Sequence, residues 1–325
     1  MRNLLSLLLA AGLGAALPAA EPYQIAVIPK GTTHEYWKAV QAGALKAERE
    51  LTAAGVPVHV IWKGPLKEDD REQQVQVVEN FIGRRVSAIV ISPLDSNALI
   101  APLAVAVQGG IPVVTIDSSL NSSLPATYVA TDNREGGRVA ARTLGGLVGP
   151  QGRVLMLRNV TGSANTEERE AGFLEAMQKE FPGIKLVSTD QHGGVTRDNA
   201  YRAGQNLLNR FGRDLDGVFA SNQPTTAGLL LALRDAGLAG GKVKFVGFDS
   251  GAAELVALKA GDISALMVQD PFRMGYLGVK HAVAAVRGEP VPKLVDTGVT
   301  VVTRDNLDQP AVRALINPPL DEYLK

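Results

Sequence analysis

The chain has 325 residues, no cysteine, and a formal net charge of +0 at pH 7 from 33 basic and 33 acidic residues. Its length favours two domains over one, and its balanced charge gives no electrostatic case for binding nucleic acid or an acidic membrane surface. The lack of cysteine excludes disulfides, cysteine metal sites and the lipid-bearing cysteine of a bacterial lipoprotein.

The first twenty residues have the features of a secretory signal peptide. Arg2 supplies a positive charge, an apolar stretch begins at Leu4, and Pro18-Ala19-Ala20 provides small residues near a cleavage point. The apolar stretch is short for a membrane-spanning helix. We therefore expect residues 1–20 to be removed and the mature protein to be exported and soluble.

Seven short apolar runs along the chain are each followed by polar residues. Continuous apolar runs of four or five residues are typical of parallel strands that are buried on both faces. Ligands of open parallel sheets bind beyond the carboxyl ends of the strands. The polar residues after these runs therefore mark a candidate binding crevice. The runs are 25–28, 88–91, 112–116, 154–157, 217–220, 245–248 and 265–268.

Strands and amphipathic helices alternate on both sides of a loop at 118–127, which is rich in Ser, Asn and Pro. This order predicts an α/β protein of two doubly wound parallel-sheet lobes. Before the loop we expect helices 36–51, 70–82 and 96–108 and strands 25–28, 58–62, 86–91 and 111–116. After it we expect helices 135–147, 167–181, 196–211 and 224–236, a further helix from Ala252, and strands 154–157, 184–188, 218–220, 243–248 and 265–268.

Eight short motifs resemble, in order and with similar spacing, those of ribose-type periplasmic sugar-binding proteins of ABC transporters. Each motif alone is weak, but together they cover essentially the whole mature chain. The motifs are IAVI at 25–28 with Tyr36-Trp37, SPLD at 92–95, PVVTID at 112–117, ATDN at 130–133, EREAGF at 168–173, VFASN at 218–222, VGFD at 246–249 and QDP at 269–271.

The resemblance implies two lobes joined by a three-segment hinge, with crossings near Thr131, Gln269 and Thr297. The first lobe would comprise 21–131 plus 270–297, and the second 132–269 plus 298–325. The family implies a periplasmic monomer that captures a sugar or sugar-like polyol between its lobes and delivers it to the permease of an ABC importer. The alternative is a ligand-loaded sensor subunit for a chemoreceptor or histidine kinase. No cofactor or metal is expected.

The same resemblance, carried over position by position, implies nine ligand-binding residues. A sugar hydroxyl is both a donor and an acceptor, so planar polar side chains suit it, and an aromatic face can cover the C–H side of the ring. The nine residues are Lys30, His34, Tyr36, Trp37, Asp117, Arg169, Asn222, Asp249 and Gln269.

Several of these residues also have a purely structural interpretation. Tyr36 and Trp37 could belong to the core. Arg169 stands among glutamates and could form a solvated salt bridge. Asn222 precedes a helix and could cap it, as could Asp249.

The chain departs from the ribose-binding pattern at four positions. Ser118 stands where the pattern has arginine, and Val195 where it has an aromatic residue. Lys30 and His34 replace small polar residues. These differences argue against ribose itself, and leave open a different sugar, a polyol, or a sugar with a negative group facing Lys30.

Two rival classes fit the sequence less well. An enzyme is not indicated, since the four histidines have no metal-ligand spacing and no Gly-x-Ser-x-Gly motif occurs. The segment 237–242 lacks the spacing of a phosphate-binding loop. Sugar-responsive repressors share the same two-lobe core, but they begin with a helix-turn-helix where this chain has its signal-like segment.

Overall fold

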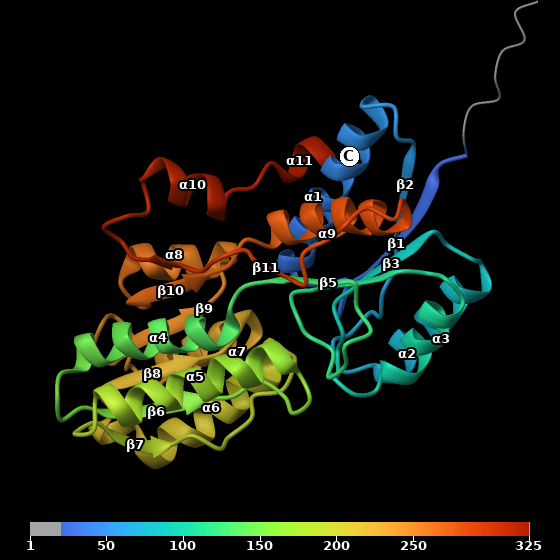
Figure 1. Cartoon of the computed structure of the whole chain (residues 1–325). Helices are drawn as coiled ribbons and strands as arrows, with labels where there is room; N and C mark the ends of the chain where they lie inside the picture. Colours follow the sequence, from blue (N-terminus) through green and yellow to red (C-terminus); the bar gives the residue numbers. More distant parts are fainter. Residues whose placement is uncertain (1–20, 325) are drawn as a thin grey trace, which may run out of the picture.

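The computed structural model describes residues 21–324, so the expected signal peptide at 1–20 lies outside the described residues. Figure 1 shows two lobes, each a six-stranded sheet with helices on both faces. The strand orders are β11-β5-β4-β3-β1-β2 and β12-β10-β9-β8-β6-β7. All neighbours are parallel except β12, which pairs antiparallel with β10. The predicted fold class is therefore confirmed.

The first sheet is formed mainly by the apolar runs of the first half of the chain, and its two central strands, 88–91 and 113–116, are fully buried. Helices α1 and α9 cover one face of this sheet, and α2 and α3 cover the other. The strands are β1 (Tyr23–Ile28), β2 (Val58–Trp62), β3 (Ala88–Ile91), β4 (Val113–Ile116), β5 (Thr127–Ala130) and β11 (Leu294–Asp296). The helices are α1 (Glu35–Ala53), α2 (Arg71–Gly83), α3 (Ile100–Gln108) and α9 (Pro271–Val286).

The second sheet repeats this arrangement. Helices α4 and α5 cover one face, and α6, α7, α8 and α10 cover the other. The strands are β6 (Arg153–Leu157), β7 (Lys185–Ser188), β8 (Gly217–Ala220), β9 (Lys244–Phe248), β10 (Ala265–Val268) and β12 (Thr300–Val302). The helices are α4 (Asn133–Val148), α5 (Ala164–Glu180), α6 (Arg197–Phe211), the 3-10 turn Gly212–Asp214, α7 (Gln223–Asp235), α8 (Ala252–Ala260) and α10 (Pro310–Ile316).

The chain passes between the two sheets three times: from β5 to α4, from β10 to α9, and from β11 to β12. The first and third passages are bonded to each other. Thr131 Oγ1 donates to the Gly298 carbonyl at 2.8 Å, and the Thr297 N–H donates to the Ala130 carbonyl at 2.9 Å. These two hydrogen bonds tie the first and third passages together.

Aspartate side chains cap the helices that begin at two of these passages. Asp132 accepts the Glu135 N–H at the start of α4, and Asp270 accepts the Arg273 N–H at the start of α9. Each cap satisfies one of the N–H groups that a helix leaves unpaired at its start.

A last short helix, α11 (Leu320–Tyr323), leaves the second lobe and contacts α1 of the first, as Figure 1 shows. Arg49 Nη1 donates to the Glu322 carbonyl at 2.8 Å, and its guanidinium lies 4.8 Å from the centre of the Tyr323 ring. The C-terminal segment therefore reaches both lobes. Among residues 21–324, no helix is both long and apolar enough to cross a membrane.

Two expectations about local structure were wrong. Strand β5 covers 127–130, where no strand was expected, and its first residue lies within the predicted loop at 118–127. Helix α3 begins at Ile100 and not at 96. The reason lies in Asp95, whose Oδ1 accepts the backbone N–H groups of Asn97 and Ala98. This Asx-type turn holds the segment in a non-helical conformation.

Helices α4 and α5 approach so closely that only glycine fits at their contact. A Cβ on Gly137 would lie 1.9 Å from the carbonyl oxygen of Arg169, and one on Gly172 would lie 2.0 Å from that of Arg134. The pair of glycines therefore fixes where α5, and with it Arg169, stands relative to the second sheet.

Candidate functional site

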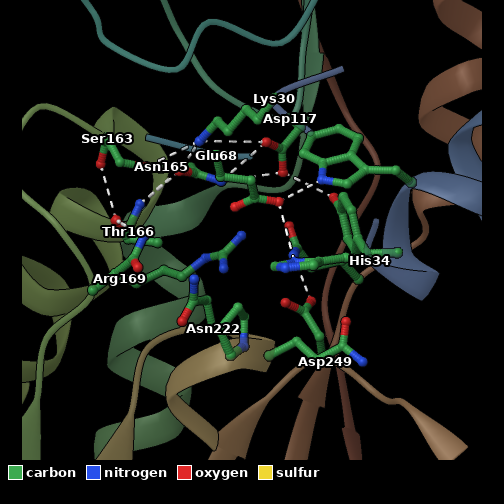
Figure 2. Close-up of a pocket in the computed structure, with 16 residues that line it drawn as sticks. Lys30, His34, Glu68, Asp117, Ser163, Asn165, Thr166, Arg169, Asn222 and Asp249 are labelled. Carbon is green, nitrogen blue, oxygen red and sulfur yellow. Dashed lines mark hydrogen bonds and ion pairs between the residues drawn. The ribbon is translucent and has the colours of Figure 1, made fainter. Parts of the chain in front are cut away.

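A cavity lies between the lobes, at the carboxyl ends of both sheets. All nine residues expected to bind ligand line it, and Figure 2 shows most of them pointing toward a common centre. The lining residues are Lys30, His34, Tyr36, Trp37, Glu68, Asp117, Asn159, Ser163, Asn165, Thr166, Arg169, Asn222, Gln223, Pro224, Asp249 and Gln269.

Strand ends supply much of this lining, because parallel strands bring their carboxyl ends to one edge. Each of the seven apolar runs is a strand, and six of the seven are followed by a lining residue. The exception is Asp95 after β3, which pairs with Arg71 at 3.1 Å and lies outside the cavity.

Arg169 is the largest charged group that faces the cavity, and it is only 1% exposed. Its Nε donates to Asn133 Oδ1 at 2.8 Å and its Nη1 to the Ser221 carbonyl at 3.1 Å. The Phe248 ring lies 4.1 Å below the guanidinium. The remaining nitrogen, Nη2, is buried without a hydrogen-bond partner among the described residues. Arg169 is therefore held rigidly with one donor free, and it is not a solvated salt bridge.

Asp249 enters the cavity from the end of β9. Its backbone has a φ of +67°, in the left-handed region that non-glycine residues rarely adopt. Its Oδ1 accepts from Gln269 Nε2 at 2.7 Å, while Gln269 Oε1 is buried with no partner in the described part of the chain. Gly251, and not Asp249, stands at the N-cap of α8. Burial raises the pKa of Asp249, although the Arg169 charge and the Gln269 hydrogen bond oppose this.

Asn222 both caps a helix and lines the cavity. Its Oδ1 accepts from the Thr225 backbone N–H at 3.2 Å, and Thr225 Oγ1 accepts from the Asn222 backbone N–H at 3.1 Å, which completes a capping box at the start of α7. Because the cap uses only the oxygen, the amide Nδ2 remains available to donate into the cavity.

Asp117 follows β4 with a φ of +61° and is nearly fully buried. Tyr36 donates to its Oδ1 and Ser92 to its Oδ2, both at 2.8 Å. Asn165 Nδ2 lies 3.1 Å from both oxygens. Lys30 Nζ lies 3.7 Å from Oδ2. Protein donors thus already surround this carboxylate.

The aromatic wall comes from the start of α1. Tyr36 and Trp37 pack edge to face with ring centres 5.1 Å apart, and both also belong to the apolar cluster beneath α1. Trp37 Nε1 donates to Glu68, whose carboxylate also lies 3.2 Å from His34 Nδ1. The pair His34–Glu68 therefore closes this side of the cavity.

The two members of that pair have opposite pKa shifts. Burial lowers the pKa of His34, but the hydrogen bond and negative charge of Glu68 outweigh it, so its pKa lies above 6.5. Burial raises the pKa of Glu68, but His34, Trp37 and Lys30 outweigh it, so its pKa lies below its usual value.

The pair is expected to stabilise the ligand-free protein most at mildly acidic pH. The contribution of His34 is complete below about pH 6.5 and is lost as the pH rises through its raised pKa. A partly buried pair of this kind contributes about 0.5–1 kcal/mol, or roughly 1–3 °C in Tm. In thermal unfolding, the Tm of wild type should exceed that of His34→Gln by this amount at pH 6, and the two Tm values should be equal at pH 9. A constant difference across this range would contradict the assignment.

Seven lining residues were not predicted from the sequence. Asn159 could have been found, because it follows β6 as the other ligand candidates follow their strands. Glu68 lies on a loop with no such signal, and Ser163, Asn165 and Thr166 lie where a loop enters α5. Gln223 and Pro224 begin α7, directly after Asn222. Of the four departures from the ribose-binding pattern, Lys30 and His34 line the cavity, whereas Ser118 and Val195 do not.

Comparison with known proteins places the chain in a family. Residues 25–290 match the model of the periplasmic binding protein domain, so the chain belongs to this family of two-lobe binding proteins. It is 30% identical over 257 residues to the ribose import binding protein of Bacillus subtilis, covering 79% of this chain and 80% of the relative.

Solved structures similar to this chain support the same family assignment. A carbohydrate-transporter solute-binding protein from Agrobacterium radiobacter in complex with D-arabinose is 37% identical, covering 91% of this chain and 99% of that one, with a TM-score of 0.86. An ABC transporter solute-binding protein from Agrobacterium vitis with bound D-fucose is 31% identical, covering 90% of this chain and 100% of that one, with a TM-score of 0.85. The relatives are sugar-binding proteins of ABC transporters, which favours transport over the sensor alternative.

Proposed function

We propose that the cavity binds a neutral monosaccharide or polyol for import. The single observation that carries this is a set of buried polar atoms, on three residues that line the cavity, with no hydrogen-bond partner among residues 21–324: Arg169 Nη2, Gln269 Oε1 and Asn159 Oδ1. An unpaired buried polar atom costs about 1–3 kcal/mol. A ligand whose hydroxyls both donate and accept would satisfy the donor and the two acceptors together.

The charges of the cavity favour a neutral ligand over a sugar acid. Three carboxyl groups, from Glu68, Asp117 and Asp249, line the cavity together with two basic side chains, Lys30 and Arg169. Lys30 already lies within hydrogen-bonding or ion-pair distance of protein groups, so it offers little to a ligand carboxylate. An added negative charge would also approach the buried carboxylate of Asp249. A neutral ligand is therefore favoured over a sugar with a negative group facing Lys30.

The remaining parts of the proposal follow from the family. The mature protein acts in the periplasm as a soluble monomer, without a lipid anchor, and presents its sugar to the permease of an ABC importer. The nine residues named from the sequence contribute the binding wall. The moving bodies are 21–131 plus 270–297 and 132–269 plus 298–325, and the sugar is released unchanged.

A thermal-shift screen of purified protein tests this function. The panel should contain D-arabinose, D-fucose, D-ribose, xylitol and matching sugar acids, and the best ligands should then be measured by calorimetry. A neutral sugar is expected to bind with Kd near micromolar, about −8 kcal/mol, and to be recovered without chemical change. Preference for a sugar acid, or turnover of the sugar, would overturn the proposal.

A further inference from the structure

At one end of the cavity, four side chains satisfy one another across the gap between the lobes. We call Lys30, Asp117, Ser163 and Asn165 the interlobe clamp. Lys30 and Asp117 follow β1 and β4 of the first sheet. Ser163 and Asn165 lie at the start of α5, which covers the second sheet. Figure 2 shows them joined by a continuous set of contacts.

The clamp leaves little bonding capacity for a ligand. Lys30 Nζ donates to Ser163 Oγ at 2.9 Å and to Asn165 Oδ1 at 2.8 Å, and lies 3.7 Å from Asp117. Asn165 uses its Nδ2 on both oxygens of Asp117 and its Oδ1 on Lys30 and on the Thr166 N–H. Every one of these side chains is at least nine-tenths buried.

At the other end of the cavity, some buried polar atoms are not paired with any protein group of residues 21–324. There Arg169 Nη2 and Gln269 Oε1 are buried without partners among the described residues. Asp249 and Asn222 also point into the space in front of Arg169 in Figure 2. The protein thus completes one end of the site by itself and leaves the other end incomplete.

We propose that the clamp acts as a positioning device that stabilises the closed arrangement of the lobes, while the Arg169 end distinguishes one sugar from another. The proposal rests on the proposed sugar-binding function. It changes the role of Lys30 and Asp117: they act on affinity through closure and not through contact with the sugar.

Closure and contact have different signatures in binding data. Apparent affinity scales with the fraction of protein in the binding-competent state. A change in that fraction therefore weakens every ligand by the same factor. A lost contact with the sugar instead weakens most the ligands that used it, and so changes their ratio.

The test is the Kd of D-arabinose and D-fucose, by calorimetry, in wild type, Lys30→Met and Ser163→Ala. Lys30→Met is expected to weaken both sugars by the same factor, about tenfold or more, and Ser163→Ala by a smaller common factor. Gln269→Leu, at the other end, is expected to change the ratio of the two Kd values. A changed ratio in Lys30→Met would show that Lys30 contacts the sugar and would overturn the proposal.

A measurement without sugar separates this proposal from the proposed function. Small-angle X-ray scattering of sugar-free protein should give a larger radius of gyration for Lys30→Met than for wild type, because the clamp no longer holds the lobes together. Equal radii would overturn the clamp even if sugars bind. If no sugar binds wild type while the radii differ, the clamp stands and the proposed ligand class fails. Thermal unfolding of each variant checks that it is folded.

Discussion

Replacing Arg169 with alanine is expected to weaken sugar binding by about 10- to 100-fold, or roughly 1.5–3 kcal/mol. The change removes a charged donor, Nη2, that has no hydrogen-bond partner in the described part of the chain, on a residue that lines the cavity. Because Asn133, the Ser221 carbonyl and Phe248 of the second lobe hold the guanidinium in place before ligand arrives, binding loses little entropy in fixing it. Calorimetry with the best neutral sugar of the screen measures the effect. Asp249→Ala should also weaken sugar binding.

The matched control is Arg134→Ala. Arg134 lies on α4 near Arg169 but is exposed, and its ion pairs with Glu168 and Glu175 are 3.1 and 3.2 Å long. Exposed pairs contribute about 0–1 kcal/mol to stability, so this variant should bind sugar as wild type does. Unchanged affinity in a folded Arg169→Ala would mean that the sugar binds elsewhere.

Replacing Gly137 with alanine is expected to destabilise the second lobe by about 1–3 kcal/mol. Its Cβ would lie 1.9 Å from the Arg169 carbonyl oxygen, so α4 and α5 must separate. Since Arg169 is carried by α5, sugar affinity should fall as well, although Gly137 itself does not line the cavity. Urea unfolding and calorimetry on the same protein measure the two effects.

Gly146→Ala, on the same helix, is the control. Gly146 is exposed, and an added Cβ would meet no atom within 4 Å. Alanine favours the helix over glycine by about 0.5–1 kcal/mol, so this variant should be slightly more stable and bind sugar normally. If Gly137→Ala were as stable as Gly146→Ala, the close approach of α4 and α5 would be contradicted.

The sequence predicted the architecture well because strands buried on both faces have an unmistakable composition. The runs at 25–28 and 245–248, for example, are apolar without interruption and are strands β1 and β9. Short elements were harder to predict. Strand β5 and the C-terminal helices are short, and α11 is held by contacts with Arg49 that local pattern does not encode.

Part of the candidate site could also be predicted, because the buried strands that lead to it are recognisable in the sequence. Asp117, Asn222 and Asp249 follow buried strands, so their meeting at one edge is dictated by the sheet. Glu68 could not be predicted, because it reaches the cavity from a loop whose path depends on its contacts with His34 and Trp37. The partners of Lys30 also could not be predicted, since Ser163 and Asn165 lie more than 130 positions away.

The most direct test is a crystal structure of the protein bound to the neutral sugar that ranks first in the screen. We predict the sugar between the two sheets, with one hydroxyl accepting from Arg169 Nη2 and another donating to Gln269 Oε1, and with Lys30 still bonded to Asn165. A sugar bound outside this cavity, or one that leaves both of those buried atoms without a partner, would contradict the account.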